Sequence, residues 1–253
     1  MPRPVTADPG LTVSHAQRSR RVQALLALIG LPLWFAGWAI AASRFGLDVV
    51  FTARAAWLSA VPLLIAIIFV PLCLAGPRET RWQTFVVQWF LFSSLWIIAW
   101  EAPPVLYSSA FEDVAYTLDN LPRYIWWWGY FSSDLDYGER TPFFRLAELS
   151  WWVIVVPVVA GLIQLRRGRV PQALLLLGLC GALQFYNVCY YMAYGGIVEN
   201  FDNVASDSIL APLLYWILNA LWGVAGGIAS ALAFRLLFRR YVLRAGSGSD
   251  GTT

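Results

Sequence analysis

The chain has 253 residues, of which 59% are hydrophobic, 16% are aromatic and only 13% are charged. Because charged residues make up about a quarter of an ordinary soluble domain, this composition excludes that class. The single histidine, His15, lies in a polar N-terminal segment, which excludes an intramembrane histidine base, a Ser-His-Asp triad and a metal site with histidine ligands.

Six segments are apolar and long enough to cross a bilayer, which takes about 20 helical residues. They are residues 22–43, 55–76, 82–107, 144–166, 170–193 and 208–237. The sequence therefore predicts an all-α, polytopic membrane helix bundle. Two N-terminal helices (22–76) precede a four-helix domain (80–237). Residues 1–21 are expected to form a polar tail and residues 238–253 a flexible one.

The distribution of arginine predicts the orientation of the bundle. Basic residues gather before the first span and after the second, fourth and sixth spans: Arg18, Arg20, Arg21, Arg78, Arg81, Arg166, Arg167, Arg169, Arg235, Arg239, Arg240 and Arg244. Because basic segments stay on the inner side, both termini are predicted to be cytoplasmic. Arg44 and Arg54, between the first two spans, would then lie outside and fit this rule less well. We expect a bacterial plasma membrane, or the endoplasmic reticulum in a eukaryote.

The third span ends near Glu101, and Pro103 and Pro104 are expected to end or bend this helix. The connection 108–143 follows and contains the run "YIWWWGYF" at 124–131. Aromatic rings of this kind prefer the headgroup layer of a membrane. We therefore expect this connection to lie on the membrane or dip into it, and to cover the outer mouth of the bundle.

The last three spans contain further polar residues. Glu148 lies near the start of the fourth span, Gln184 and Asn187 lie in the fifth, and Asn219 lies in the sixth. With the predicted orientation, these residues and Glu101 all fall in the outer half of the membrane. Their common depth predicts one polar pocket.

Each of these residues also has a structural interpretation, which the sequence leaves open. Acids inside a membrane are functional candidates by default, yet Glu101 could emerge at the interface and Glu148 could serve only as a pairing partner. Gln184 and Asn187 could join helices through hydrogen bonds. Trp222 alone is typical of packing, and the pair Tyr190–Tyr191 alone is typical of an interfacial belt.

A pocket of carboxyl, amide, phenol and indole groups favours one kind of chemistry. A carboxyl group buried in an apolar site can hold its proton near neutral pH and protonate an alkene. Aromatic faces then stabilise the resulting carbocation. Removal of a different proton completes a double-bond isomerisation or a cyclisation, neither of which needs a cofactor.

From about residue 80 to 237 the chain resembles the emopamil-binding protein family, whose shared domain is called EXPERA. The resemblance rests on "LYWILNALWGV" at 214–224, on "WWGYFSSD" followed by "AELSWW", and on "LQFYNVCYYMAYGGIVEN". The family has an acid fourteen residues beyond an aspartate, and Asp134 and Glu148 keep that spacing. Glu101 resembles an acid late in another span of the family.

This family comprises sterol 8,7-isomerases and sterol-binding receptors. The resemblance implies an EXPERA-like membrane domain with pocket acids at Glu101 and Glu148, and with Asn219 and Trp222 in contact with the ligand.

The chain departs from the family at three points. Ile97 stands where the isomerases carry a histidine, and Gly129 stands where they carry an acid. The first span, 22–43, is extra to the family's arrangement.

We therefore expect a cofactor-independent membrane isomerase acting on a terpenoid or sterol-like substrate, or a membrane terpene cyclase of specialised metabolism. Glu148 is the expected principal acid/base, with Glu101 as its partner. The expected substrate-binding residues are Asn219, Trp222, Gln184, Tyr186, Asn187, Tyr191 and Asp134. The expected partners are a hydrophobic isoprenoid-derived molecule and membrane lipid, without metal, cofactor or nucleic acid; a homodimer is left open.

Two other functions stay open. One is a binding protein for sterols or hydrophobic amines without turnover, which the missing histidine at Ile97 favours. The other is a proton-coupled transporter, which the almost purely aliphatic inner half of the predicted bundle disfavours.

Overall fold

The computed structural model describes residues 9–107, 110–111, 114–139 and 141–242, with side chains from His15 onward except at 144 and 242. Arg244, most of the predicted C-terminal tail and parts of the 108–143 connection lie outside these residues.

Every element of the described part is helical. The elements are α1 (Pro9–Leu25), η1 (Leu26–Gly30), α2 (Leu31–Phe45), α3 (Val49–Leu74), α4 (Arg78–Trp96), η2 (Ile97–Glu101), α5 (Ala102–Leu106), α6 (Leu121–Phe131), α7 (Leu135–Glu139), α8 (Pro142–Arg166), α9 (Val170–Ile197), α10 (Leu210–Leu237) and η4 (Phe238–Val242).

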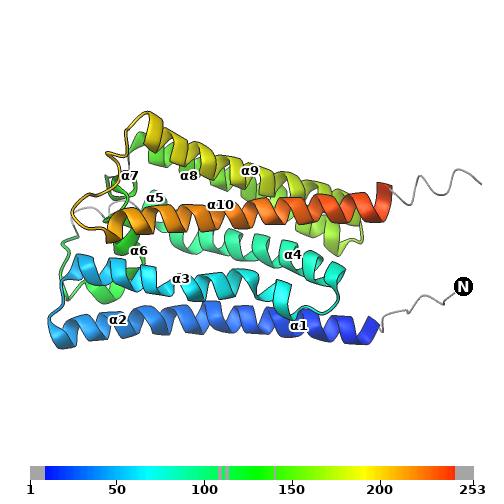
Figure 1. Ribbon diagram of the computed structural model, residues 1–253, viewed down its shortest axis with the longest axis horizontal. Helices are drawn as coiled ribbons and strands as arrows, with labels where there is room; N and C mark the ends of the chain where they lie inside the picture. Colours follow the sequence, from blue (N-terminus) through cyan, green and yellow to red (C-terminus); the bar gives the residue numbers. More distant parts are fainter. Residues whose placement is uncertain (1–8, 108–109, 112–113, 140, 243–253) are drawn as a thin grey trace, which may run out of the picture.

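Six of the helical segments are long and apolar enough to cross a membrane, as the sequence predicts. The chain therefore has the architecture of a multi-pass membrane protein. Figure 1 shows the long helices side by side, with α1 and η4 at one end of the bundle and α6 and α7 at the other. The first described residues and the last thus lie at the same end.

The structure corrects the boundaries of both predicted tails. The first helix begins at Pro9 instead of residue 22, because part of the polar N-terminal segment packs on the bundle. Ser19 donates to Gln88 Oε1 over 3.3 Å, and Gln23 donates to the Ile67 carbonyl over 3.0 Å. At the other terminus the last helix continues to residue 242.

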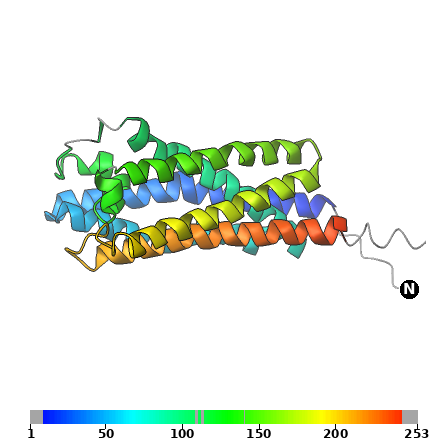
Figure 2. The same cartoon turned by 90° about the horizontal axis from the view of Figure 1, so that it is seen from above.

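Helices α9 and α10 pack closely together, and small residues allow this approach. A Cβ atom on Gly181 would lie 2.7 Å from the Gly226 carbonyl oxygen and 2.8 Å from the Ser230 nitrogen. Small residues at such a crossing let two membrane helices pack backbone to backbone. The α8 helix packs on the other side of α9 (Figure 2), and α4 packs on α10 (Figure 1).

The short helix α6 packs on α3 and also contacts α2 and α10. Two indole groups of the spans donate hydrogen bonds to the Trp126 carbonyl oxygen, from Trp57 Nε1 over 3.1 Å and from Trp100 Nε1 over 2.6 Å. Part of the 108–143 connection therefore closes one end of the bundle and is held there by hydrogen bonds to its backbone.

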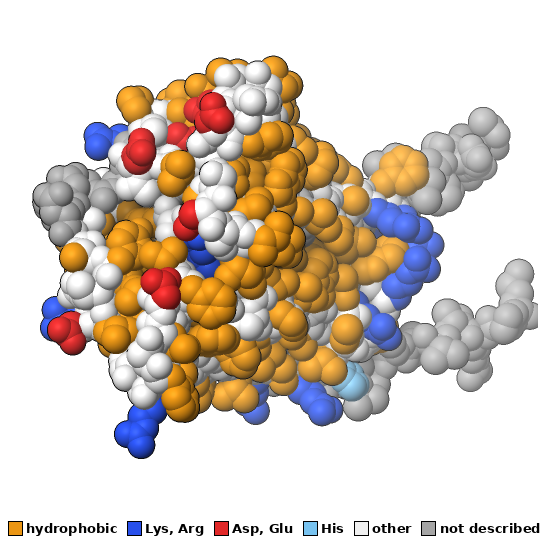
Figure 3. All heavy atoms as spheres, turned by 60° about the vertical axis from the view of Figure 1, so that its left-hand side comes forward, with side chains coloured by type: hydrophobic (Ala, Val, Ile, Leu, Met, Phe, Trp, Pro, Cys, Tyr) orange, Lys and Arg blue, Asp and Glu red, His pale blue; other side chains and the backbone are white. Residues whose placement is uncertain are grey.

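Charged side chains mark the two ends of the molecule. Figure 3 shows an apolar flank, acidic side chains with a few basic ones at the near end, and basic side chains gathered toward the end where α1 and η4 lie. At the termini, Arg240 forms an ion pair with Glu79 over 3.1 Å. This segregation fits the predicted topology, whereas the side that faces the cytoplasm stays a prediction.

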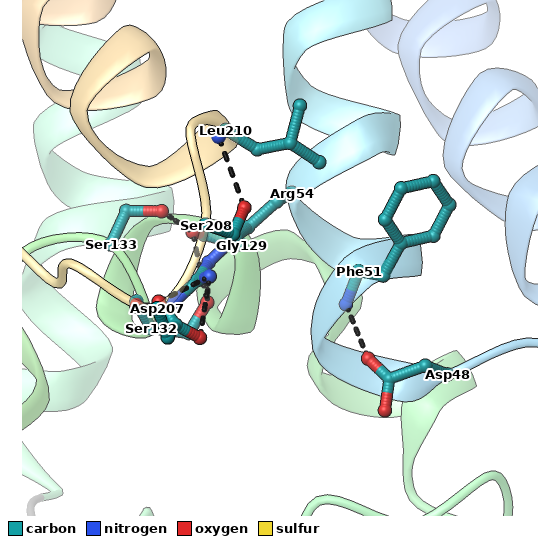
Figure 4. Close-up of polar contacts among 9 residues, drawn as sticks. All are labelled: Asp48, Phe51, Arg54, Gly129, Ser132, Ser133, Asp207, Ser208 and Leu210. Atoms are coloured by element: carbon teal, nitrogen blue, oxygen red, sulfur yellow. Dashed lines mark hydrogen bonds and ion pairs between the residues drawn. The ribbon is translucent and has the colours of Figure 1, made fainter.

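Arg54, which fitted the charge rule poorly, has a structural role. Its side chain is only 3% exposed and pairs with Asp207 over 2.8 Å. It also donates to the Ser132 hydroxyl over 3.1 Å and to the Ser132 carbonyl oxygen (Figure 4). Arg54 thus ties α3 to the end of α6 and to the segment before α10, and its charge is neutralised within the protein.

Candidate functional site

A cavity of about 60 Å³ lies between the end of the third span, α6, α7 and the last three spans. Its lining residues are Trp57, Trp96, Trp100, Glu101, Tyr130, Tyr137, Ala147, Trp151, Val188, Tyr191, Leu218, Asn219 and Trp222. Since one water needs roughly 10–15 Å³ of such space, the cavity has room for a few waters. A polycyclic ligand enters only if side chains move.

Indole rings form much of the cavity wall. The Trp96 ring lies 5.7 Å from Trp100 and 5.3 Å from Trp222, measured between centroids. Tyr130 and Tyr137 meet edge to face at 4.8 Å. Electron-rich faces on several sides of a small space are suited to holding a positive charge.

Two carboxyl groups meet at this cavity. Glu101 lines it and is 8% exposed, whereas Glu148 lies behind it and is completely buried. The two side chains interact directly, and the Tyr137 hydroxyl donates to Glu148 Oε1. Each acid also has a buried second oxygen, Oε2, without a hydrogen-bond partner among the described residues. Two adjacent carboxyl groups out of water hold one shared proton at lower cost than two negative charges.

The π-helical turn η2 places Glu101 at this position. The turn covers Ile97–Glu101 and contains both Trp100 and Glu101, which are buried. A π-helical turn shifts the residues that follow it around the helix axis, and such turns are frequent at functional sites.

A second polar layer lies beside the acid pair. Asn219 donates to the Tyr130 hydroxyl over 2.9 Å, and the Tyr191 hydroxyl donates to Asp134 Oδ2 over 2.7 Å. Asp134 is completely buried outside the spans, and this burial raises its pKa to about 8, although the hydrogen bond from Tyr191 opposes the shift. Burial also raises the pKa of Tyr137 well above its ordinary value.

The structure brings Glu101, Asn219, Trp222 and Tyr191 together as lining residues of one cavity, with Glu148 and Asp134 in contact with that lining. The acid that touches the open space is Glu101, although the sequence favoured Glu148 as the principal acid. Glu101 and not Glu148 faces the cavity because of the fold: Tyr137 of α7 lines the cavity and contacts Glu148, which does not line it.

The other predicted contacts lie elsewhere. Gln184 accepts a hydrogen bond from Trp89 Nε1 over 2.8 Å and Asn187 donates to Ser150 over 2.6 Å, so both join helices. Tyr186 is 63% exposed and points away from the bundle. At about 100° per residue, Gln184, Val188 and Tyr191 share the inner face of α9, and position 186 falls on the opposite face.

Most residues of the aromatic wall are not among the site residues predicted from the sequence. Trp96 and Trp100 are four residues apart and thus on one face of the third span, a spacing that could have been used. Tyr137 lies three residues beyond Asp134 within the motif segment. Trp57 comes from the second span, outside the region of resemblance, and carries no local signal.

Gly129, one of the departures from the family, has a clear packing reason. A Cβ atom there would lie 2.3 Å from Trp57 Cδ1 and 2.5 Å from the Ala53 carbonyl oxygen. The close approach of α6 to α3 therefore leaves no room for an acid. Ile97, another of the three departures, is buried and does not line the cavity.

Within the described residues, no three His, Cys, Asp or Glu side chains converge as a metal site.

No family model matches the chain, and neither a curated protein nor a solved structure is significantly similar to it.

Proposed function

We propose that this chain is a cofactor-independent membrane enzyme that protonates a carbon–carbon double bond in an isoprenoid-derived substrate. The observation that carries the proposal is the Glu101 carboxyl group at the wall of an indole-lined cavity, backed by Glu148. An acid that touches the cavity can donate a proton, and the surrounding rings can stabilise the cation that forms.

The proposed reaction needs only these groups. Glu101 gives its proton to one alkene carbon, whose π electrons form the new C–H bond and leave a cation on the neighbouring carbon. A carboxylate of the pair then removes a proton from an adjacent carbon, and the electrons of that C–H bond form the new double bond. The proton count is unchanged at the end. If another double bond of the substrate attacks the cation first, the same steps yield a ring.

The walls of the cavity suit such a cation. Trp96, Trp100 and Trp222 present three mutually packed indole rings. Each cation–π contact in a desolvated site contributes about 2 kcal/mol. Asn219 and Tyr130, joined by a hydrogen bond, would orient the substrate on the remaining side.

The resemblance to the emopamil-binding protein family supports the same proposal, because its motif residues Asp134, Glu148, Asn219 and Trp222 come together around this cavity. The substrate class proposed is a terpenoid or a sterol-like molecule. Isomerisation is the first candidate and cyclisation the second.

The alternative is a receptor for hydrophobic amines without turnover. One observation favours it: a buried carboxyl pair inside an aromatic box is also a good site for an ammonium group. The absence of histidine at Ile97 favours it too.

The test compares Glu101→Gln and Glu148→Gln with the unaltered protein in turnover of terpenoid and sterol candidates. General acid catalysis contributes about 10²- to 10⁴-fold, so each variant should lose at least about 100-fold in rate. Glu79→Gln, at the other end of the same helical segment, is the matched control and should keep full activity. Full activity in both pocket variants would contradict the assignment.

Heavy water distinguishes the two functions. An enzyme that protonates carbon incorporates deuterium into its product, and a receptor does not. Binding of a hydrophobic amine without any labelling of the candidate substrates would support the receptor.

A further inference from the structure

A line of ionisable groups connects the cavity with a cleft at the surface. The cleft has a volume of about 430 Å³ and lies between α7 and the segment after α9. Its lining includes the acids Asp136, Glu139, Glu199 and Asp202. Water can therefore reach carboxyl groups at this end of the bundle.

Asp136 and Glu199 interact across this cleft. Asp136 is almost fully buried and accepts a hydrogen bond from the Thr141 hydroxyl over 2.7 Å. Glu199 is partly exposed, and burial, with the charge of Asp136 second, raises its pKa. A pair of acids at the mouth of a cleft can exchange protons with water.

Asp134 lies between this pair and the cavity. On the cleft side, its carboxyl group interacts electrostatically with Asp136. On the cavity side, it accepts a hydrogen bond from the Tyr191 hydroxyl over 2.7 Å. The backbone fixes this position, because Leu135 N donates to the Asn203 carbonyl over 2.7 Å and Ala205 N donates to the Ser133 carbonyl over 3.0 Å. A buried carboxyl group held between two polar compartments has the placement of a proton relay.

On the cavity side, Tyr191 and Tyr130 share the lining with Glu101. The cavity has room for a few waters, and its polar lining groups can bind them. Water in the cavity would thus join the two tyrosine hydroxyls to the Glu101 carboxyl group.

We propose that Asp134 relays protons between the surface cleft and the Glu101–Glu148 pair, a role that rests on the proposed function of this pair. A proton arrives at Asp134 from the cleft acids. The Tyr191 hydroxyl, which donates to Asp134 in the resting state, first turns toward the cavity. Asp134 then gives its proton to the Tyr191 oxygen while the hydroxyl's own proton moves to cavity water and on to Glu101. The reverse sequence returns one proton to the cleft, so no charge accumulates.

A completed turnover leaves the proton count of the pair unchanged, so the relay serves to correct the protonation state of the pair between turnovers. Glu148 has no exposed surface and Glu101 has little, so neither exchanges freely with bulk water. If the pair is left with the wrong number of protons, the relay restores it. The groups that face Asp134 are Tyr130 of α6, Asp136 and Tyr137 of α7, Tyr191 of α9 and Tyr215 of α10. Arg54, the nearest cation of α3, is occupied by Ser132 and Asp207.

Infrared spectroscopy of the full chain in phosphatidylcholine vesicles tests the relay without a substrate. The carbonyl band of the protonated pair is identified by its loss in Glu101→Gln. After transfer to heavy water, the band shifts as the proton is replaced by deuterium. We expect Asp134→Asn to slow this exchange at least tenfold, and Asp134→Glu to restore it.

Two further variants complete the design. Tyr191→Phe removes the hydroxyl link while leaving the Asp134 carboxyl group, and should also slow the exchange. Asp119→Asn changes an exposed acid of the same connection and should leave the rate unchanged. Circular dichroism confirms that each variant is folded, and Tyr191→Phe serves if Asp134→Asn fails to fold.

Exchange as fast in Asp134→Asn and Tyr191→Phe as in the unaltered protein would overturn the relay. A spectrum without a band that depends on Glu101 would overturn it as well, because the pair would then hold no proton to exchange. Unslowed exchange in these variants overturns the relay alone, because the proposed function is judged separately by substrate turnover in Glu101→Gln. A missing band contradicts both the relay and the proposed function.

Discussion

Substitution of Gly129 by alanine tests whether the close contact of α6 with α3 sets the shape of the site. The added Cβ would lie 2.3 Å from Trp57 Cδ1, against at least 3.4 Å for an ordinary contact, so this contact is 1.1 Å too short and must be relieved by a shift of the indole or by separation of the helices. The Ala53 carbonyl oxygen at 2.5 Å is backbone and cannot turn aside. The separation would stretch the hydrogen bonds from Trp57 and Trp100 to the Trp126 carbonyl.

The expected cost follows from two opposing effects. Overpacking of a core costs about 1–3 kcal/mol, and the two short contacts place Gly129→Ala at the upper end. Alanine recovers about 1 kcal/mol through its better helix propensity. The net loss of about 2 kcal/mol corresponds to a fall in Tm of roughly 4–8 °C for a chain of this size.

Thermal unfolding in detergent micelles measures this change, with Gly37→Ala as the matched control. Gly37 also lies in a helix, but nothing is within 4 Å of its added Cβ. The control should therefore keep or raise the Tm. If Gly129→Ala is as stable as Gly37→Ala, the contact with α3 is not as close as described and the explanation for the missing acid is wrong.

Two further predictions concern buried charges. Asp207→Asn removes the carboxylate from the buried guanidinium of Arg54 and should cost about 1–2 kcal/mol, less than a fully buried pair because Asp207 is itself 60% exposed. Arg54→Met in the same background should recover part of the lost Tm, and an unchanged Tm in Asp207→Asn would show that the pair is not stabilising. The second prediction concerns Asp134, whose pKa is about 8 in the folded chain against 3.8 for an ordinary aspartate. As the pH rises from 3.8 through about 8, the unfolded chain loses this proton while the folded chain keeps it, so the free energy of unfolding should fall. Unfolding measured across that range should show this slope, and Asp134→Asn should flatten it.

Much of the candidate site could be anticipated from depth and spacing. Glu101 and Asn219 line the cavity, because charges and amides in apolar helices turn inward, where partners exist. Trp222 lines it too, because it lies three residues beyond Asn219 on the same helix face. Depth and spacing alone could not tell which inward side chains line the cavity and which only join neighbouring helices. Gln184 shares the inner face of α9 with Tyr191 but meets Trp89 of α4 instead. Only the packing of neighbouring helices decides what an inward side chain touches.

The sequence by itself determined the class of the protein: six apolar segments, segregated charges and a set of polar side chains at one depth. These features are local or periodic. The length and hydropathy of a segment decide whether it crosses a bilayer, and the charge of its flanks decides its orientation. The tertiary structure decided the rest. It placed Glu101 rather than Glu148 at the cavity wall, brought Trp57 from outside the motif region into that wall, and buried Arg54 against Asp207. Such contacts join residues far apart in the chain, and they depend on where α6 and α7 come to rest, which no local pattern specifies.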